Sequence, residues 1–315
     1  MGGLRLAARR SVKEACRLLP RPWLLRLRAA YLGSTSPIWR RLVGCVLRGV
    51  RLRGLPSHEP FTVPGTYPAL RMVPSDSYVT QHLYWLGLGG YETGEPAWWA
   101  RLVASHRSVL EVGANVGLYT LVGAAASPAT RYRAVEANPA TCAVLRQNLV
   151  LNGLDHVDVC GAAVVGVGDG HQTVRLRVPH GDPYRLPAGA FIDRARGVHS
   201  RWRSEILVPA VPIADLIDGV DLVKLDIEGL EHEVLSAVRT WLAVEQPTLL
   251  VEVWDDADEL QALLGQLVRD LGYTAVAVTR HGAVEVPVAD LVGGRLQSSY
   301  GTRDVTLILS SRMPV

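Results

Sequence analysis

The stretch 109-VLEVGANVGLYT-120 is the most informative part of this chain. Apolar residues lead into Glu111, and Gly113 and Gly117 follow with three residues between them. The pattern predicts a strand, a tight turn and a helix, but it differs from the G-x-G-x-x-G turn of dinucleotide-binding folds. A carboxylate just ahead of the turn is unfavourable for a pyrophosphate, so the stretch favours a ligand that is cationic or rich in hydrogen-bond donors.

Short β-rich segments alternate with helical segments from residue 107 onward. We expect strands near 108–112, 131–136, 156–160, 221–226, 248–254, 273–279 and 303–310, and helices near 116–126, 139–152, 229–242 and 257–271. The alternation predicts an α/β fold with a mostly parallel sheet covered on both faces. It lapses between 165 and 210, where 173–178 is expected as a hairpin strand and 179–205 as a loop or flap.

The second predicted strand ends in 133-RAVEANP-139 and places Glu136 beside the first turn, because ligands of open parallel sheets bind beyond the carboxyl ends of the strands. A carboxylate there accepts both hydroxyls of a ribose. A ribose on one side and a cationic, non-phosphate group on the other describe S-adenosyl-L-methionine. The alternative is that Glu111 and Glu136 only cap the adjacent turns.

Several segments together carry a resemblance to a known family: 90-GYE-92, 110-LEVGANVGLYT-120, 135-VEANP-139, 221-DLVKLDIEGLEHEVL-235 and 247-PTLLVEV-253. Over roughly residues 76–310 the chain resembles FkbM-type S-adenosylmethionine-dependent methyltransferases. The resemblance implies a Rossmann-like, seven-stranded class I methyltransferase sheet with an antiparallel last strand. It also implies methyl transfer to a hydroxyl of a sugar, a glycan, a polyketide or another secondary metabolite.

The resemblance also suggests a cofactor site, and its extent together with the composition of the N-terminal residues suggests a domain division. The turn after the first strand is expected to hold the methionine portion of the cofactor, and Tyr91 and Glu92 are candidates for its amino-acid end. The predicted cofactor-binding residues are Glu92, Glu111, Gly113, Ala114, Asn115, Gly117, Glu136, Ala137 and Asn138. We expect residues 1–75 to form a basic helical extension with a Pro/Gly-rich linker, and residues 76–315 to form the methyltransferase domain.

The segment 221-DLVKLDIEGLEHEVL-235 supplies the predicted catalytic residues. Asp226 ends a strand and is expected beside the methyl group of the cofactor. A hydroxyl acceptor with a high pKa needs a general base, and our candidates are Glu228, then Asp226, then His232. Glu228 is expected to begin a helix that carries His232 on the same face, and repulsion between Asp226 and Glu228 is expected to raise the pKa of one of them.

Each catalytic candidate has a structural alternative. Glu228 also suits the N-terminus of its helix, and His232 also suits an ordinary helix surface. Asp226 is also placed to form an ion pair with Lys224. Asp226 with Glu252 or Asp255 is an alternative Mg²⁺ site, but nothing in the sequence defines a complete ligand set, and we predict no metal.

Acceptor selectivity is expected to reside in the 179–205 flap and in residues 76–92. Aromatic and polar side chains of the flap are candidates for an acceptor wall, with a solvated loop as the alternative. These side chains are Tyr184, Phe191, Trp202, His180 and His199.

The N-terminal region differs in charge from the rest of the chain. Residues 1–53 contain thirteen Lys and Arg residues and one acidic residue, Glu14. We expect one or two basic amphipathic helices that contact an anionic membrane peripherally, and the alternative is a helical cap packed on the body. A nucleic-acid partner is disfavoured, because few aromatic or polar base-reading residues interleave with the basic ones.

Other features bear on the compartment. No apolar run reaches the ~20 residues that span a bilayer, and arginines interrupt the apolar stretches that a signal peptide would need. The four cysteines form no C-x-x-C pair, which argues against a zinc site or a disulfide framework. We therefore expect a cytoplasmic protein, with peripheral contact at the inner face of the membrane.

Two other functional classes are weighed against O-methyl transfer. A nicotinamide-dependent oxidoreductase is disfavoured, because the second glycine of G-x-G-x-x-G is missing. A non-catalytic or membrane-docked S-adenosylmethionine-binding module is disfavoured by the acidic residues after the fourth strand. The sequence specifies neither the acceptor nor the oligomeric state.

Overall fold

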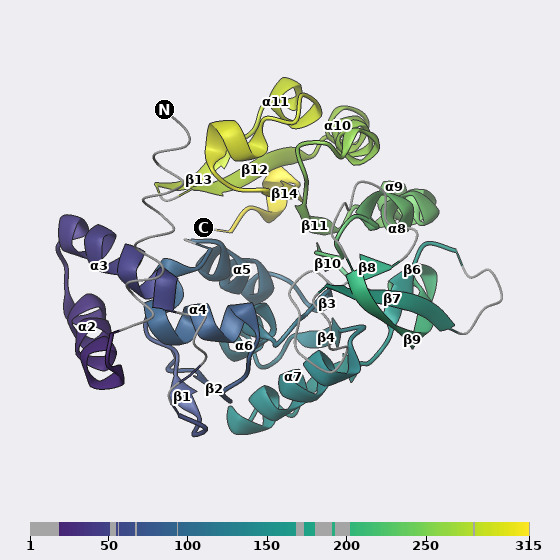
Figure 1. Cartoon of the computed structure of the whole chain (residues 1–315). Coiled ribbons are helices and arrows are strands. Elements are labelled where there is room, and N and C mark those ends of the chain that lie inside the picture. Colours follow the sequence, from purple (N-terminus) through teal and green to yellow (C-terminus); the bar gives the residue numbers. More distant parts are fainter. Residues whose placement is uncertain are drawn as a thin grey trace. The chain divides into compact units, whose positions relative to one another are not determined.

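A computed structural model describes residues 19–50, 55, 57–66, 68–92, 94–167, 173–179, 191–192, 202–279 and 281–314 of the chain. The chain divides into two compact units, Met1–Thr93 and Gly94–Val315 (Figure 1). The domain boundary between residues 75 and 76 that the sequence suggests stays a prediction. None of the helices among the described residues is long and apolar enough to cross a membrane.

The first unit has a small helical core of its own. Its elements are α2 (Arg21–Gly33), α3 (Pro37–Val50), β1 (Phe61–Thr62), β2 (Arg71–Met72), α4 (Tyr78–Leu86) and η2 (Leu88–Gly90). Helices α2 and α3 contribute Leu24, Tyr31, Val43 and Leu47, which pack against Trp85 and Leu86 of α4. The sequence predicted one or two basic helices, and the described residues form two, each with one face buried within this unit.

An eight-stranded sheet forms the centre of the second unit. Its strands are β3 (Ser108–Val112), β4 (Arg131–Val135), β5 (Val157–Cys160), β10 (Leu222–Leu225), β11 (Thr248–Glu252), β12 (Thr274–Thr279), β13 (Gly282–Glu285) and β14 (Asp304–Ile308). Their order is β13-β12-β14-β11-β10-β3-β4-β5, and β14 runs antiparallel to both of its neighbours. The seven predicted strands and the antiparallel last strand are confirmed.

Strand β13 is an addition to the predicted sheet. It pairs with β12 as an antiparallel edge strand, and all four of its residues are exposed. An exposed edge strand has no buried face, so its residues lack the alternation of apolar and polar side chains by which strands are recognised. Strands β3 and β10, in contrast, are buried along their whole length, as expected for a parallel sheet covered on both faces.

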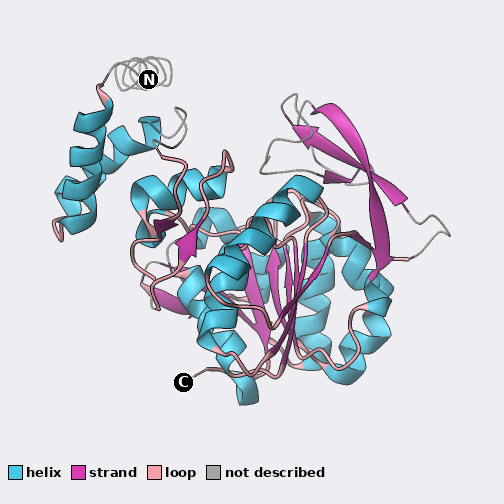
Figure 2. Ribbon diagram, turned by 90° about the horizontal axis from the view of Figure 1, so that it is seen from below, coloured by secondary structure: helices cyan, strands magenta, loops and turns pink. Residues whose placement is uncertain are grey.

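Helices cover both faces of this sheet (Figure 2). They are α5 (Glu95–Ala104), α6 (Leu118–Ala126), α7 (Pro139–Leu151), α8 (Glu231–Ala237), α9 (Arg239–Glu245), α10 (Asp258–Leu271) and α11 (Val288–Val292). The single helix predicted over 229–242 is wrong, because the structure has two helices that meet at Val238. The first of them begins at Glu231, because Glu228 and Gly229 have left-handed φ angles of 55° and 102°.

A smaller four-stranded sheet interrupts the βα alternation. It consists of β6 (Ala163–Val165), β7 (Thr173–Pro179), β8 (Phe191–Ile192) and β9 (Trp202–Pro212), in the order β6-β9-β7-β8. The predicted hairpin strand is confirmed as β7, which pairs antiparallel with β9. Residues 202–205, expected as part of the flap loop, belong to β9. The flap positions His180, Tyr184 and His199 lie outside the described residues, as do the side chains of Phe191 and Trp202.

Candidate functional site

The turn between β3 and α6 is held in a conformation that few residues adopt. Gly113, Asn115 and Gly117 have φ angles of 86°, 52° and 94°. A Cβ atom on Gly113 would lie 1.8 Å from the carbonyl oxygen of Asp226, and one on Gly117 would lie 2.5 Å from Leu145. The two glycines therefore allow the turn to approach the end of β10 on one side and α7 on the other.

Glu136 lies at the carboxyl end of β4 and joins two turns. Its Oε2 accepts a hydrogen bond from the backbone N–H of Asn115 at 2.9 Å, and its Oε1 accepts one from that of Asn138 at 2.8 Å. Burial raises the pKa of Glu136 to about 7, although these two N–H groups oppose the rise. Each carboxylate oxygen has a further lone pair, so the capping role that the sequence allowed is compatible with accepting ribose hydroxyls.

Glu111 is buried beneath the first turn and is 1% exposed. Its Oε2 accepts hydrogen bonds from the hydroxyls of Thr120 at 2.8 Å and Tyr132 at 2.6 Å. Burial raises the pKa of Glu111, and the nearby charge of Lys224 opposes that rise. The contacts show that Glu111 ties α6 and β4 to the turn, while its expected contact with the cofactor stays a prediction.

The β4–α7 turn offers unsatisfied donor and acceptor atoms. Asn138 caps α7, since its Oδ1 accepts from the N–H of Ala140 at 2.9 Å, and Pro139 stands at the first helical position. Asn138 Nδ2 and Thr141 Oγ1 are buried without a hydrogen-bond partner among the described residues. Together with the glycine turn and Glu136, these atoms fit the donors and acceptors of a nucleoside.

Asp226 emerges at the carboxyl end of β10, as expected. Lys224 Nζ donates to Asp226 Oδ2 at 2.9 Å, and the side chain of Lys224 is 3% exposed against 38% for Asp226. Burial disfavours the charged form of Lys224, but Asp226 and other carboxylates outweigh it and raise its pKa. The ion pair that the sequence allowed is therefore present, and the side chain of Asp226 remains partly exposed.

Glu228 and Glu231 are close in sequence but differ in environment. Glu231 is 2% exposed and accepts from the backbone N–H groups of Ile227 at 2.9 Å and Gly229 at 3.0 Å. Glu228 is half-buried in the left-handed turn that Glu231 braces. Burial, together with the charges of Asp226 and Glu231, raises the pKa of Glu228 to about 7. Such a pKa suits a general base near neutral pH.

His232 lies on α8 and contacts one side chain of α8 and one of α10. Its Nε2 is 3.2 Å from Ser236 Oγ, and its Nδ1 is 3.7 Å from Glu259 Oε2. The expectation that Glu228 and His232 share a helical face is wrong, because Glu228 precedes the helix. The side chain of His232 is 39% exposed, and its catalytic role stays a prediction.

Glu252 is a candidate that sequence reasoning considered only as a metal ligand. It ends β11 directly beside Asp226, since Leu225 pairs with Val251 in the parallel register. Trp254 Nε1 donates to Glu252 Oε2 at 3.2 Å, and Arg303 Nη1 lies 3.9 Å from Oε1. Burial and the charges of Asp226, Asp304 and Glu228 raise the pKa of Glu252 to about 9. Its place in 247-PTLLVEV-253 was the available signal.

Within the described ranges, no three His, Cys, Asp or Glu side chains group as metal ligands, which leaves the Mg²⁺ alternative without a ligand set. Glu92 belongs to the first unit and has a φ of 38°, and its role at the cofactor stays a prediction.

The smaller sheet packs beside the turns that follow β4 and β10. Leu176 of β7 and Val208 of β9 share a hydrophobic cluster with Leu230, and Ile227 and Ala137 pack against the same cluster. Ile227 and Leu230 flank the turn that carries Glu228, and Ala137 follows Glu136. The smaller sheet therefore touches both the β4 turn and the β10 turn.

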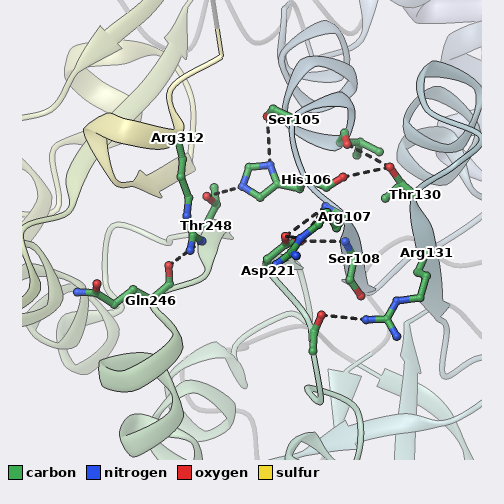
Figure 3. A network of polar contacts seen from close by, with 12 residues as sticks. Ser105, His106, Arg107, Ser108, Thr130, Arg131, Asp221, Gln246, Thr248 and Arg312 are labelled. Atoms are coloured by element: carbon green, nitrogen blue, oxygen red, sulfur yellow. Dashed lines mark hydrogen bonds and ion pairs between the residues drawn. The ribbon is translucent and has the colours of Figure 1, made fainter.

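A different polar network lies at the other end of the strands, where the parallel strands of the large sheet begin (Figure 3). We call this end of the sheet the amino edge, and the end that carries Asp226 and Glu252 the carboxyl edge. Asp221 accepts from the backbone N–H groups of Arg107 at 3.1 Å and Ser108 at 2.8 Å. His106 lies 2.7 Å from the carbonyl of Leu102 through Nδ1 and 2.8 Å from the hydroxyl of Thr248 through Nε2. Burial lowers the pKa of His106, so a neutral ring with its proton on Nδ1 satisfies both contacts.

Comparison with known proteins identifies a family. The model of the methyltransferase FkbM domain matches residues 111–275 of this chain. No protein with a curated description matches.

Solved structures of methyltransferases are similar to the chain at low sequence identity. A methyltransferase FkbM from Methylobacillus flagellatus KT is 17% identical, with a TM-score of 0.39, over 65% of this chain and 44% of that protein. An O-methyltransferase from Bacillus cereus in complex with SAH is 10% identical, with a TM-score of 0.37, over 69% of this chain and 82% of that one. The O-methyltransferase TomG from Streptomyces achromogenes, in complex with SAM, is 10% identical, with a TM-score of 0.33, over 70% and 81%. The chain thus spans less than half the length of the Methylobacillus protein.

Proposed function

The chain belongs to the FkbM methyltransferase domain family, with S-adenosyl-L-methionine as its cofactor, and from this premise we propose that it methylates a hydroxyl of a sugar, a glycan or a secondary metabolite. When bound, the cofactor supplies an electrophilic methyl group on a sulfonium. The observation that carries the proposal is the half-buried Glu228 beside Asp226, in the turn that adjoins the Gly113 turn.

We propose that the chain holds the cofactor between the turns after β3 and β4. Gly113, Ala114, Asn115 and Gly117 line the methionine side, and Glu136, Ala137 and Asn138 line the ribose side. Glu136 accepts the ribose hydroxyls through the lone pairs that its backbone partners leave open. Glu111 supports the first turn from below, and its negative charge favours a cationic ligand above it.

The proposed chemistry is an in-line displacement, so the chain must align an acceptor oxygen and remove its proton. Glu228 is our first candidate for the base, because a pKa near 7 combines a useful ionised fraction with basicity. Asp226, which pairs with Lys224, is the second candidate, and His232 is the third. Glu252 is expected to be protonated at neutral pH, so it is suited to donate a hydrogen bond to the acceptor.

Titration calorimetry with S-adenosylhomocysteine and NAD tests the cofactor assignment. We expect binding of S-adenosylhomocysteine and no response to NAD. Replacing Glu136→Ala should weaken that binding by about ten- to a hundredfold, because two ribose hydrogen bonds to a charged group are lost. Glu285→Ala, at an exposed carboxylate on β13, is the matched control and should bind normally. A wild-type protein that ignores S-adenosylhomocysteine contradicts the proposal.

Methyl transfer from radiolabelled S-adenosylmethionine to a panel of sugars and other hydroxylated compounds tests the base. With an acceptor found, Glu228→Gln should reduce turnover by about a hundredfold or more, and Asp226→Asn should reduce it less. Full turnover in both variants would show that the base assignment is wrong. A protein that binds the cofactor but methylates nothing in the panel would favour the non-catalytic module.

We also propose a cytoplasmic protein that contacts the membrane peripherally through residues 1–53. The support is charge: residues 19–50, the described part of this segment, contain arginines and no acidic residue. Such contact would bring the methyltransferase unit close to a lipid-linked acceptor.

A further inference from the structure

Helix α3 has apolar side chains on two different faces. Val43 and Leu47 are 5% and 0% exposed and belong to the core of the first unit. Ile38 and Leu42 lie one turn apart and are 75% and 61% exposed. At 100° per residue the two pairs point about 140° apart around the helix. The first pair packs in the core of the unit. The second pair is exposed, so packing within the unit does not explain its apolar side chains.

The helical hairpin of α2 and α3 also exposes two tryptophans. Trp39 follows Ile38 on α3 and is 43% exposed, and Trp23 on α2 is 58% exposed. We call Trp23, Ile38, Trp39 and Leu42 the anchor residues. Tryptophan is enriched where an apolar phase meets water, because its large ring is apolar and its N–H donates a hydrogen bond.

The charged residues on α2 and α3 are all positive. Arg21, Arg26 and Arg41 are exposed on the same two helices, and residues 19–50 contain no Asp or Glu. Apolar side chains flanked by arginines without any acidic residue are the pattern of a helix that lies in the interface of an anionic bilayer. An interface for a folded protein is instead depleted in charge at its centre.

We propose that the anchor residues insert into the interfacial region of a bilayer of anionic phospholipid, and that Arg21, Arg26 and Arg41 bind its headgroups. The inference rests on the proposed peripheral contact of residues 1–53, and it names the side chains and the lipid class. Half-buried Arg28 is not among these headgroup ligands, because its Nε donates to the carbonyl of Tyr84 within the unit.

Co-sedimentation of the full chain with vesicles tests the inference. One vesicle type contains equal parts of phosphatidylcholine and phosphatidylglycerol, and the other contains phosphatidylcholine alone. We expect the wild type to sediment with the first type only. The triple variant Ile38→Gln, Trp39→Gln and Leu42→Gln should bind the anionic vesicles at least about tenfold more weakly, because three apolar side chains no longer insert into the bilayer.

A matched control replaces exposed apolar side chains of the second unit and leaves α2 and α3 unchanged. Val150→Gln and Val244→Gln alter side chains that are 72% and 71% exposed in the second unit, and the double variant should sediment like the wild type. A second variant, Arg21→Gln, Arg26→Gln and Arg41→Gln, should lose the preference for phosphatidylglycerol. S-adenosylhomocysteine binding, measured on every variant, shows that the catalytic unit is intact.

Each contradictory outcome has a distinct meaning. If the triple anchor variant sediments like the wild type, the anchor residues are wrong while peripheral contact stands. If the wild type binds both vesicle types equally, the assignment of anionic lipid is wrong. If the wild type stays in the supernatant with both, peripheral contact itself fails, and the surface fits an acidic protein instead. None of these results depends on whether the cofactor binds.

Discussion

The two edges of the large sheet both carry polar groups but treat them differently. At the amino edge, Asp221 accepts hydrogen bonds from two backbone N–H groups, and His106 contacts one carbonyl and two hydroxyls. At the carboxyl edge, Glu228 and Glu252 have pKa values raised to about 7 and about 9 by burial and by neighbouring carboxylates. Polar groups with hydrogen-bond partners stabilise a fold, whereas crowded carboxylates destabilise it, and such crowding is typical of functional sites.

The comparison shows why polar residues alone do not identify a site. Figure 3 draws a dense network at the amino edge, in which Asp221 and His106 both have partners that satisfy them. At the carboxyl edge the cation of Lys224 is outnumbered by carboxylates. A protein tolerates such an excess of like charge where function requires it, and stability is lower as a result.

The largest loss of stability is expected at Gly113, where the turn after β3 approaches the end of β10 at the carboxyl edge. Gly113→Ala should reduce the free energy of unfolding by more than about 3 kcal/mol, because its Cβ would overlap the carbonyl of Asp226 at a left-handed φ. Gly153→Ala is the matched control: its φ is 65° but nothing lies within 4 Å, so a loss of about 1 kcal/mol is expected. Urea denaturation measures both, and equal losses would contradict the proposed close approach.

The amino edge is tested by Asp221→Ala. The variant should lose about 2 kcal/mol of unfolding free energy, because two backbone N–H groups lose their charged acceptor. Its affinity for S-adenosylhomocysteine, measured by calorimetry below the melting temperature, should equal that of the wild type. A large loss of affinity at full stability would reverse the roles assigned to the two edges.

The carboxyl edge should behave in the opposite way when Glu252 is neutralised. The folded-state pKa of about 9 lies above the unfolded value near 4.5, so the folded state holds a proton that the unfolded state has released. Stability is therefore lost as pH rises from about 5 to about 9. Glu252→Gln should remove the part of this dependence that lies above about pH 7, whereas Glu136 and Glu228, with pKa values raised to about 7, keep the part below it. The unfolding free energy at pH 8 should rise, on the order of 5 kcal/mol.

Thermal unfolding across that pH range measures the effect of Glu252. The control is Glu285→Gln on exposed β13, which should follow the wild type. A wild-type stability that rises between pH 5 and pH 9 would show that Glu252 is ionised throughout and paired more closely with Arg303 than the 3.9 Å separation indicates.

The smallest effect is expected at His232. Its side chain is 39% exposed and its neighbours are Ser236 and Glu259, so His232→Asn should change unfolding free energy by less than about 0.5 kcal/mol. Turnover, once an acceptor is known, should fall by less than about tenfold. A loss as large as that of Glu228→Gln would make His232 the base.

The main elements of the fold were predictable because their signals are local. The buried strands read as apolar runs, and Asn138 with Pro139 marks the start of α7 in the sequence itself. Leu230, Val234, Val238 and Leu242 recur at helical spacing and form a buried stripe, with exposures of 0–5%. The break between α8 and α9 was missed, because the same periodicity continues through Val238 in both helices.

The resemblance of several motifs indicated the family and its cofactor from the sequence alone. The order of strands and helices was also determined by the sequence, because periodicity, glycine spacing and capping residues act over a few positions. Only the tertiary structure decided what surrounds each carboxylate. Arg303 comes near Glu252 because β14 pairs with β11, an adjacency between segments far apart in the chain. Likewise, the left-handed turn gives the backbone N–H groups to Glu231 and leaves Glu228 unmatched by them. Burial and neighbouring charge set a pKa, and both depend on contacts that sequence distance does not reveal.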